Sequence, residues 1–159
     1  MSAAPAQFPT ATILAYPRIG RQRQLKRALE ARWAGRITDA ELLDAAADLR
    51  KENLARLVEL GLDASDASLA DAPSLYDHVL DATILLGAIP PRFAGRTGLD
   101  LYFALARGDD EVGPEEMTKW FDTNYHYLVP EIGPDTPLRF ADDTVVRRFT
   151  DAREWGYVT

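Results

Sequence analysis

The chain carries a series of helix-length segments closed by glycine, and this series most limits the folds open to it. We predict helices over residues 21–33, 38–61, 74–86, 99–107 and 144–155. Glycine closes four of them, at positions 35, 61, 87 and 156, because it tolerates the backbone angles that end a helix. The second begins at a capping box, in which Thr38 and Glu41 can satisfy each other's main-chain amides. The sequence therefore predicts a helix-rich fold.

Strand signals are fewer. Residues 10–16 are rich in β-compatible side chains and stop at Pro17, which cannot donate to a ladder, so we predict a strand there. A second extended segment is expected within residues 121–129. Residues 1–9 are expected to be a disordered extension. The chain has 159 residues, 47% of them hydrophobic, and no linker or repeat, which predicts one domain over 1–159.

The charge distribution is uneven. The net charge of −7 and pI near 4.8 argue against nucleic acid as a partner, because phosphate binding needs a broad basic face. Within this acidic chain one short stretch holds five cations and no carboxylate: Arg18, Arg21, Arg23, Lys26 and Arg27. By itself such a cluster is either an anion site or a solvated helix face.

Metal and membrane chemistry find little support in the composition. The chain has no cysteine, which excludes disulfides and thiolate metal ligands within it. His78 and His126 lack a metal-ligand spacing, so we interpret both as hydrogen-bonded structural side chains. No stretch approaches the roughly 20 apolar residues of a membrane span. We predict no metal site, no catalytic residue, no membrane contact and a cytoplasmic location.

Residues 117–131 mix large rings with hydrogen-bonding groups and show no helical stripe, a composition that suits the wall of a polar ligand site. This run, MTKWFDTNYHYLVPE, closely resembles a signature of the cobalamin-independent methionine synthases. Further stretches resemble the family in the same order along nearly the whole chain: TILAYPRIG at 12–20, the basic helix start at 21–30, YDHVLD at 76–81, LGAIPPR at 86–92 and LYFALARG at 101–108.

The resemblance implies a fold and a reaction. Members of the family have two barrels and transfer a methyl group from 5-methyltetrahydrofolate polyglutamate to homocysteine. The chain would then be an α/β fragment, a partial (βα)8 TIM-type barrel that is helix-rich with few parallel strands. Zinc, which activates the homocysteine thiol, is expected in the C-terminal barrel missing from this chain, so the chain alone is expected to be inactive.

The resemblance also implies site residues for the folate polyglutamate. The family's folate-contacting helix start corresponds to Arg23, Gln24, Leu25 and Lys26, and its folate-contacting lysine to Lys119. Guanidinium groups and helix N-terminal amides both suit a tail of carboxylates. Secondary candidates are Arg18, Arg21, Asp122 and Asn124.

Each of these assignments has a plainer alternative. Gln24 stands where the family commonly has glutamate, which makes it the least secure of its group. Lys119 alone would be read as a surface partner of Glu115 across one helical turn. Asp122 and Asn124 are equally suited to a turn, and Asp77 reads as a helix-start charge.

An alternative function is a non-enzymatic binding or interaction module, or a split half that assembles with a partner chain. A partial barrel would leave strand edges and apolar faces open, so self-association is also expected.

Overall fold

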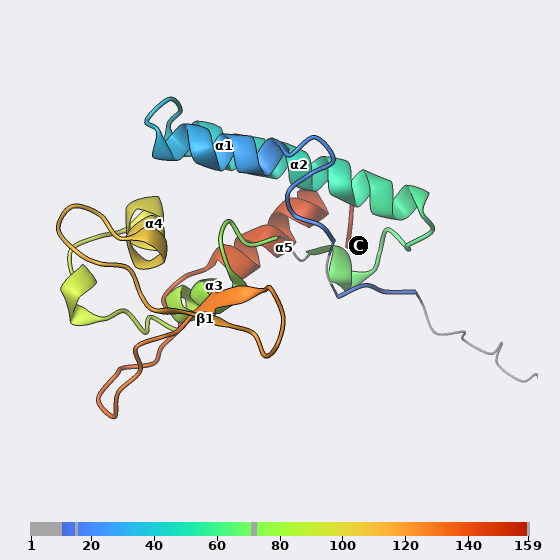
Figure 1. Cartoon of the computed structure of the whole chain (residues 1–159). Coiled ribbons are helices and arrows are strands. Elements are labelled where there is room, and N and C mark those ends of the chain that lie inside the picture. The colour runs from blue at the N-terminus through green and yellow to red at the C-terminus, as the bar shows by residue number, and fades with distance from the viewer. Residues whose placement is uncertain (1–10, 15, 71–72, 159) are drawn as a thin grey trace, which may run out of the picture. The chain divides into compact units, whose positions relative to one another are not determined.

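The computed structural model describes residues 11–14, 16–70 and 73–158, which fall into two compact units (Figure 1). The first unit comprises Met1–Pro73 and Val146–Thr159, and the second comprises Ser74–Val145. The single domain predicted from the sequence stays a prediction. The extension predicted over residues 1–9 lies outside the described residues.

The first unit is helical. Helix α1 (Gln24–Trp33) packs beside α2 (Asp39–Glu59), and a 3₁₀ turn, η1 (Ala67–Ala70), follows. Helix α5 (Thr144–Glu154) belongs to this unit from Val146 onward. Figure 1 shows α1 and α2 lying side by side along much of their length.

One apolar cluster brings together segments of this unit that are far apart in the sequence. It contains the buried side chains Leu54, Leu57, Leu69, Ala152 and Val158, with Ile13 and Tyr16 packed against them. Arg50 is the buried cation nearby in the fold, only 5% exposed. Its guanidinium donates to the Arg148 carbonyl, pairs with Asp151 at 3.4 Å and lies over the Trp155 ring. A buried cation with these partners ties α2 to α5.

The second unit is built from short elements. They are α3 (His78–Leu85), η2 (Pro91–Phe93), α4 (Gly98–Arg107), β1 (Met117–Lys119) and β2 (His126–Leu128). The two strands form an antiparallel hairpin that pairs Met117 with Leu128 and Lys119 with His126. Helix α3 packs against both α4 and β2. The side chains of Leu80, Phe93, Leu105 and Leu128 are fully buried and form the apolar interior.

The helix predictions are confirmed, with two shifted starts. The Thr38–Glu41 capping box is complete in both directions. The first helix begins at Gln24 rather than at residue 21, because Arg23 adopts a left-handed conformation with φ 61°. The third begins at His78 rather than near Ser74, because Asp77 is its N-cap.

One strand prediction is confirmed, because β2 lies within the extended segment expected over residues 121–129, and the other needs correction. Residues 11–14 and 16, within the strand predicted over 10–16, are not in a strand, and Leu14 is 98% exposed. An extended segment becomes a strand only when a partner completes its ladder, and the described residues provide none there. In the described part of the chain the sheet has two antiparallel strands, β1 and β2. It does not contain the parallel strands that a partial barrel would have. The mixture of helices with a small sheet fits an α/β fragment.

Candidate functional site

The basic segment before α1 is shaped by a tight turn. Gly20 has φ 81°, and its carbonyl accepts a hydrogen bond from the Arg23 amide at 2.9 Å. The side chain of Gln24 folds back over this turn, where its Oε1 accepts from the Gln22 amide at 3.0 Å. A Cβ at position 20 would lie 2.3 Å from that same oxygen. Glycine is therefore required here both by φ and by space.

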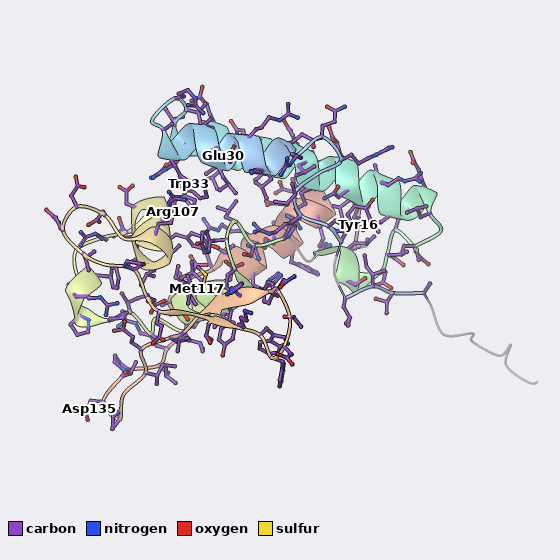
Figure 2. All side chains as sticks on the ribbon, in the orientation of Figure 1. Tyr16, Glu30, Trp33, Arg107, Met117 and Asp135 are labelled. Atoms are coloured by element: carbon purple, nitrogen blue, oxygen red, sulfur yellow. The ribbon has the colours of Figure 1, made fainter. Side chains whose placement is uncertain are left out.

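The four residues of the candidate folate contact divide into two kinds. Leu25 is 2% exposed, and its amide donates to the Ile19 carbonyl, so it anchors the helix start from inside. Gln24 stabilises the turn. The cations face outward: Arg23 is exposed, and Lys26 is 43% exposed and paired with Glu30 at 3.3 Å. Glu30 is labelled on α1 in Figure 2.

The start of α1 favours an anion on electrostatic grounds. The first turn of α1 holds no acidic residue, and no side chain caps it through a hydrogen bond. Exposed amides at a helix N-terminus carry partial positive charge, and Arg23 and Lys26 add whole charges beside them. Among the secondary candidates of this unit, Arg21 is exposed and Arg18 is partly buried.

Lys119 lies in the other unit, as the last residue of β1, the strand labelled in Figure 1. It is paired with His126 of β2 in the hairpin. Its side chain is exposed, as are those of Asp122 and Asn124 in the connecting loop. The Asn124 carbonyl lies 3.0 Å from His126 Nδ1. The structure therefore gathers Lys119, Asp122 and Asn124 on one hairpin, whose first residue, Met117, is labelled in Figure 2.

The hairpin loop is held by main-chain and hydroxyl contacts. The Trp120 amide donates to the Tyr125 carbonyl at 2.8 Å, and the Thr123 hydroxyl donates to the Trp120 carbonyl at 2.6 Å. Phe121 adopts φ 51°, which is unusual for a bulky side chain, and is 81% exposed. Its ring meets Trp120 edge to face, with centroids 5.2 Å apart. The loop is thus a defined turn that presents aromatic rings.

The helical pairing of Lys119 with Glu115 is wrong. Residues 117–119 form a strand, so residues 115 and 119 are not one helical turn apart. Glu115 is instead 2% exposed, and within the described chain neither carboxyl oxygen makes a hydrogen bond of normal geometry. Burial raises the pKa of Glu115 to about 7, the Glu131 carboxylate adds to the rise, and the Glu131 amide and Arg92 oppose it.

Two carboxylates have features that the sequence did not predict. No local pattern indicated that Glu115 would be buried. Asp77 was expected as a helix-start charge, and it does accept hydrogen bonds from the Val79 and Leu80 amides. It also accepts one from the Leu128 amide at 3.0 Å, which couples α3 to the hairpin. A helix-cap pattern predicts the first role, but nothing local predicts the second.

The candidate residues fall into two groups, one in each unit. Arg18, Arg21 and residues 23–26 lie in the first unit, and Lys119, Asp122 and Asn124 lie in the second. The structure describes the two units separately. A cleft shared by Lys119 and Arg23 therefore stays a prediction. Within the described ranges no cluster of three or more His, Asp or Glu side chains has a geometry that would hold a metal ion. None of the described helices is long and apolar enough to cross a membrane.

Comparison with known proteins supplies the family. The sequence model for "Cobalamin-independent synthase, N-terminal domain" matches residues 10–159. The chain is 53% identical over 146 residues to the 5-methyltetrahydropteroyltriglutamate–homocysteine methyltransferase of Rhodococcus jostii, an alignment that covers 91% of this chain and 19% of the relative.

Other relatives carry the same name. The Streptomyces coelicolor protein is 55% identical over 137 residues, which cover 84% of this chain and 17% of that protein. The Mycobacterium tuberculosis H37Rv protein is 51% identical over 148 residues, which cover 92% of this chain and 19% of that protein. The chain thus spans about a fifth of the length of these relatives. From the match over residues 10–159 and these identities, the chain belongs to the cobalamin-independent methionine synthase family, within its N-terminal domain.

Proposed function

We propose that this chain is the N-terminal portion of a methyltransferase that moves the methyl group of 5-methyltetrahydropteroyltriglutamate to homocysteine. The names of the relatives support this reaction. The chain spans only 17–19% of the length of those relatives, so we assign it a part of their function. In this proposal the chain binds the polyglutamate tail and braces the rest of the enzyme.

The observation that carries the binding role is the start of α1. Its first turn lacks acidic residues and is preceded by exposed Arg23, while Lys26 follows on the helix. A glutamate tail presents one carboxylate per residue, and guanidinium and ammonium groups bind such charges with hydrogen bonds. Lys119 would add a further cation from the hairpin. Arg18, Arg21, Asp122 and Asn124 are the secondary candidates.

Gln24 and Leu25 support the helix start rather than contact the ligand. Gln24 holds the turn that sets the Arg23 main chain, through its contact with the Gln22 amide. Leu25 fixes the first helical turn in the interior of the unit. In this assignment Arg23, Lys26 and Lys119 would touch the ligand, and Gln24 and Leu25 hold the helix start that presents Arg23 and Lys26.

The residues that the structure describes do not fit a zinc site. There is no cysteine in the chain, and the described residues contain no suitable cluster of other ligands. Zinc, which would activate the homocysteine thiol, would have to be held by other residues, in a C-terminal barrel that this chain would brace. We further propose that the α/β elements seen here belong to a partial (βα)8 barrel. A structure of a longer chain that contains these residues would test that arrangement.

The binding role is tested by calorimetry with mono- and triglutamate forms of 5-methyltetrahydrofolate at low and high salt. We expect tighter binding of the triglutamate at low salt, because exposed ion pairs are screened as ionic strength rises. Arg23→Ala, Lys26→Ala and Lys119→Ala should each weaken triglutamate binding by up to about fivefold, the range for exposed pairs. Arg36→Ala, at the other end of α1, is the matched control and should bind like the native chain.

Equal affinity of the native chain for the two folates would contradict a role for the basic segment in binding the polyglutamate tail.

A methyl-transfer assay tests the remainder of the proposal. The chain alone should not methylate homocysteine, and turnover by it would overturn the assignment of the chemistry to other residues.

A further inference from the structure

Asp77 has more hydrogen-bond partners than a helix cap needs. Its side chain is 3% exposed. Oδ1 accepts from the Val79 amide at 2.9 Å and Oδ2 from the Leu80 amide at 3.2 Å, which is the capping role. Oδ2 also accepts from the Leu128 amide at 3.0 Å, and Oδ1 from the Tyr125 hydroxyl at 3.4 Å. One carboxylate therefore serves both α3 and the hairpin.

The hairpin depends on such an anchor. Each of its strands has only three residues, and an isolated two-stranded hairpin is marginally stable in water. The Leu128 amide points away from β1, toward α3, and would be an unpaired buried donor without Asp77. Leaving a buried donor unpaired is costly, so this contact decides how β2 sits on α3.

The anchor lies close to the residues proposed to meet the ligand. Lys119 pairs with His126, two residues before Leu128 on β2. Tyr125, the second hairpin contact of Asp77, directly follows Asn124. The carboxylate thus holds the hairpin at Leu128 of β2 and at Tyr125, and β2 pairs with β1, the strand that carries Lys119.

We propose that Asp77 is a positioning residue that holds the β1–β2 hairpin so that Lys119 meets the polyglutamate tail, an inference that rests on the proposed folate binding. Asp77 does not contact the ligand in this arrangement. It acts through Leu128 and Tyr125, and the geometry predicts that its effect on binding passes through Lys119.

Asp77→Ser separates the two roles of the side chain. Serine caps a helix about as well as aspartate, so the contacts to Val79 and Leu80 can be replaced. The single hydroxyl is too short to also reach the Leu128 amide. Asp110→Ser removes the same charge from an exposed loop of the same unit and is the matched control.

Two measurements on the 159-residue chain test the proposal. Hydrogen exchange followed by NMR reports the Leu128 amide, and calorimetry reports triglutamate and monoglutamate binding. In Asp77→Ser we expect Leu128 exchange at least about tenfold faster, as for a lost buried hydrogen bond. Triglutamate affinity should fall to that of Lys119→Ala, with monoglutamate affinity unchanged. Asp110→Ser should match the native chain in both measurements.

The double variant Asp77→Ser/Lys119→Ala gives the decisive comparison. If Asp77 acts through Lys119, the double variant binds triglutamate no more weakly than Lys119→Ala alone. Additive losses would show a general structural effect and overturn the proposal, as would native affinity in Asp77→Ser. If Asp77→Ser does not fold, Asp77→Asn, also a good N-cap but without the charge, is measured in its place.

The same experiment separates the two proposals. Tail-dependent binding by the native chain that is weakened in Lys119→Ala supports the proposed function, and the Asp77 variants then decide the inference alone. Absence of tail-dependent binding in the native chain overturns the proposed function and the positioning role with it.

Discussion

Arg92 and Glu131 form a two-point ion pair in which Nη1 meets Oε2 and Nη2 meets Oε1. Nη2 also lies 3.5 Å from the Pro114 carbonyl. Because Pro114 precedes β1 and Glu131 follows β2, one guanidinium on η2 contacts the chain on both sides of the hairpin. Asp77 holds the hairpin from α3, and Arg92 holds its base from η2. The pair also lowers the pKa of Glu131, chiefly through its hydrogen bonds.

Glu115, buried beside this pair, should make stability fall as pH rises. Its folded pKa of about 7 lies above the ordinary glutamate pKa of 4.5, so between these two pH values the folded chain retains a proton that the unfolded chain has released. Unfolding free energy should therefore decrease from about pH 5 to pH 8. Glu115→Gln should remove this decrease and be more stable than the native chain at pH 8, by about 1–3 kcal/mol.

Urea unfolding at pH 5 and pH 8 measures this difference. Glu116→Gln is the matched control, because Glu116 is the exposed neighbour and its substitution should leave the pH dependence unchanged. A native-like pH dependence in Glu115→Gln would contradict the assignment of the transition to Glu115.

Gly20→Ala should disturb the basic segment. The new Cβ would lie 2.3 Å from Gln24 Oε1 and 2.9 Å from Leu49 Cδ1, so the Gln24 side chain must leave the turn. Gly35→Ala is the control, since Gly35 also has positive φ but has open space around it. We expect a cost of about 1 kcal/mol for the control, from backbone strain alone, and about 1–3 kcal/mol more for Gly20→Ala.

Thermal and urea unfolding measure these costs, and triglutamate calorimetry adds a functional comparison. Weaker binding is expected for Gly20→Ala only. Equal destabilisation of the two variants would mean that the close approach of Gln24 does not matter.

Releasing Lys26 from its helix partner should strengthen tail binding. Lys26 Nζ lies 3.3 Å from Glu30 Oε1, an exposed pair that competes with a ligand carboxylate. Glu30→Gln is expected to raise triglutamate affinity by up to about fivefold at low salt and to have little effect at high salt. Glu59→Gln breaks a similar exposed pair with Arg56 on α2 and serves as the charge-matched control. Calorimetry that finds the same gain in both variants would point to net charge rather than to Lys26.

Thr38→Ala should cost about 1 kcal/mol of unfolding free energy, the usual value for losing a side-chain N-cap. The Thr38 hydroxyl accepts from the Glu41 amide at 3.2 Å, and the Glu41 carboxylate accepts from the Thr38 amide at 2.7 Å. The Thr38 amide and the Thr38 hydroxyl both donate to the Glu41 carboxylate and lower the pKa of Glu41, so the stabilisation from these two bonds is present above its ordinary pKa and is lost in acid.

Thr97→Ala provides the comparison. Thr97 is the N-cap of α4 but makes no side-chain capping hydrogen bond, so its substitution should change stability by less than about 0.5 kcal/mol. Chemical denaturation of the two variants at neutral pH tests the difference. Equal costs would show that the capping bonds of Thr38 are not what stabilises α2.

The helices were predictable because their signals are local. Thr38 and Glu41 are three residues apart, and the glycines at 35, 61, 87 and 156 stand directly after the segments that they close. The error at the start of α1 came from Arg23, whose left-handed φ of 61° delays the helix by three residues. A non-glycine side chain gives no sequence signal for that conformation.

The strands were less predictable because a ladder needs a partner elsewhere in the chain. Residues 10–16 have the composition of a strand, but the described residues 11–14 and 16 have no ladder partner. In contrast, β1 was not predicted. It forms because residues 117–119 pair with residues 126–128 across a short turn, with Met117 opposite Leu128.

The sequence by itself determined the family, the helix boundaries to within a few residues, and the cationic segment that motivates the folate proposal. Only the tertiary structure decided that Leu25 faces inward, that Glu115 is buried and that Asp77 serves the Leu128 amide 51 residues away. Capping and helix periodicity depend on neighbours within one turn, so a sequence displays them directly. Burial and long-range hydrogen bonds depend on which segments pack together, and that is set by the free energy of the whole fold.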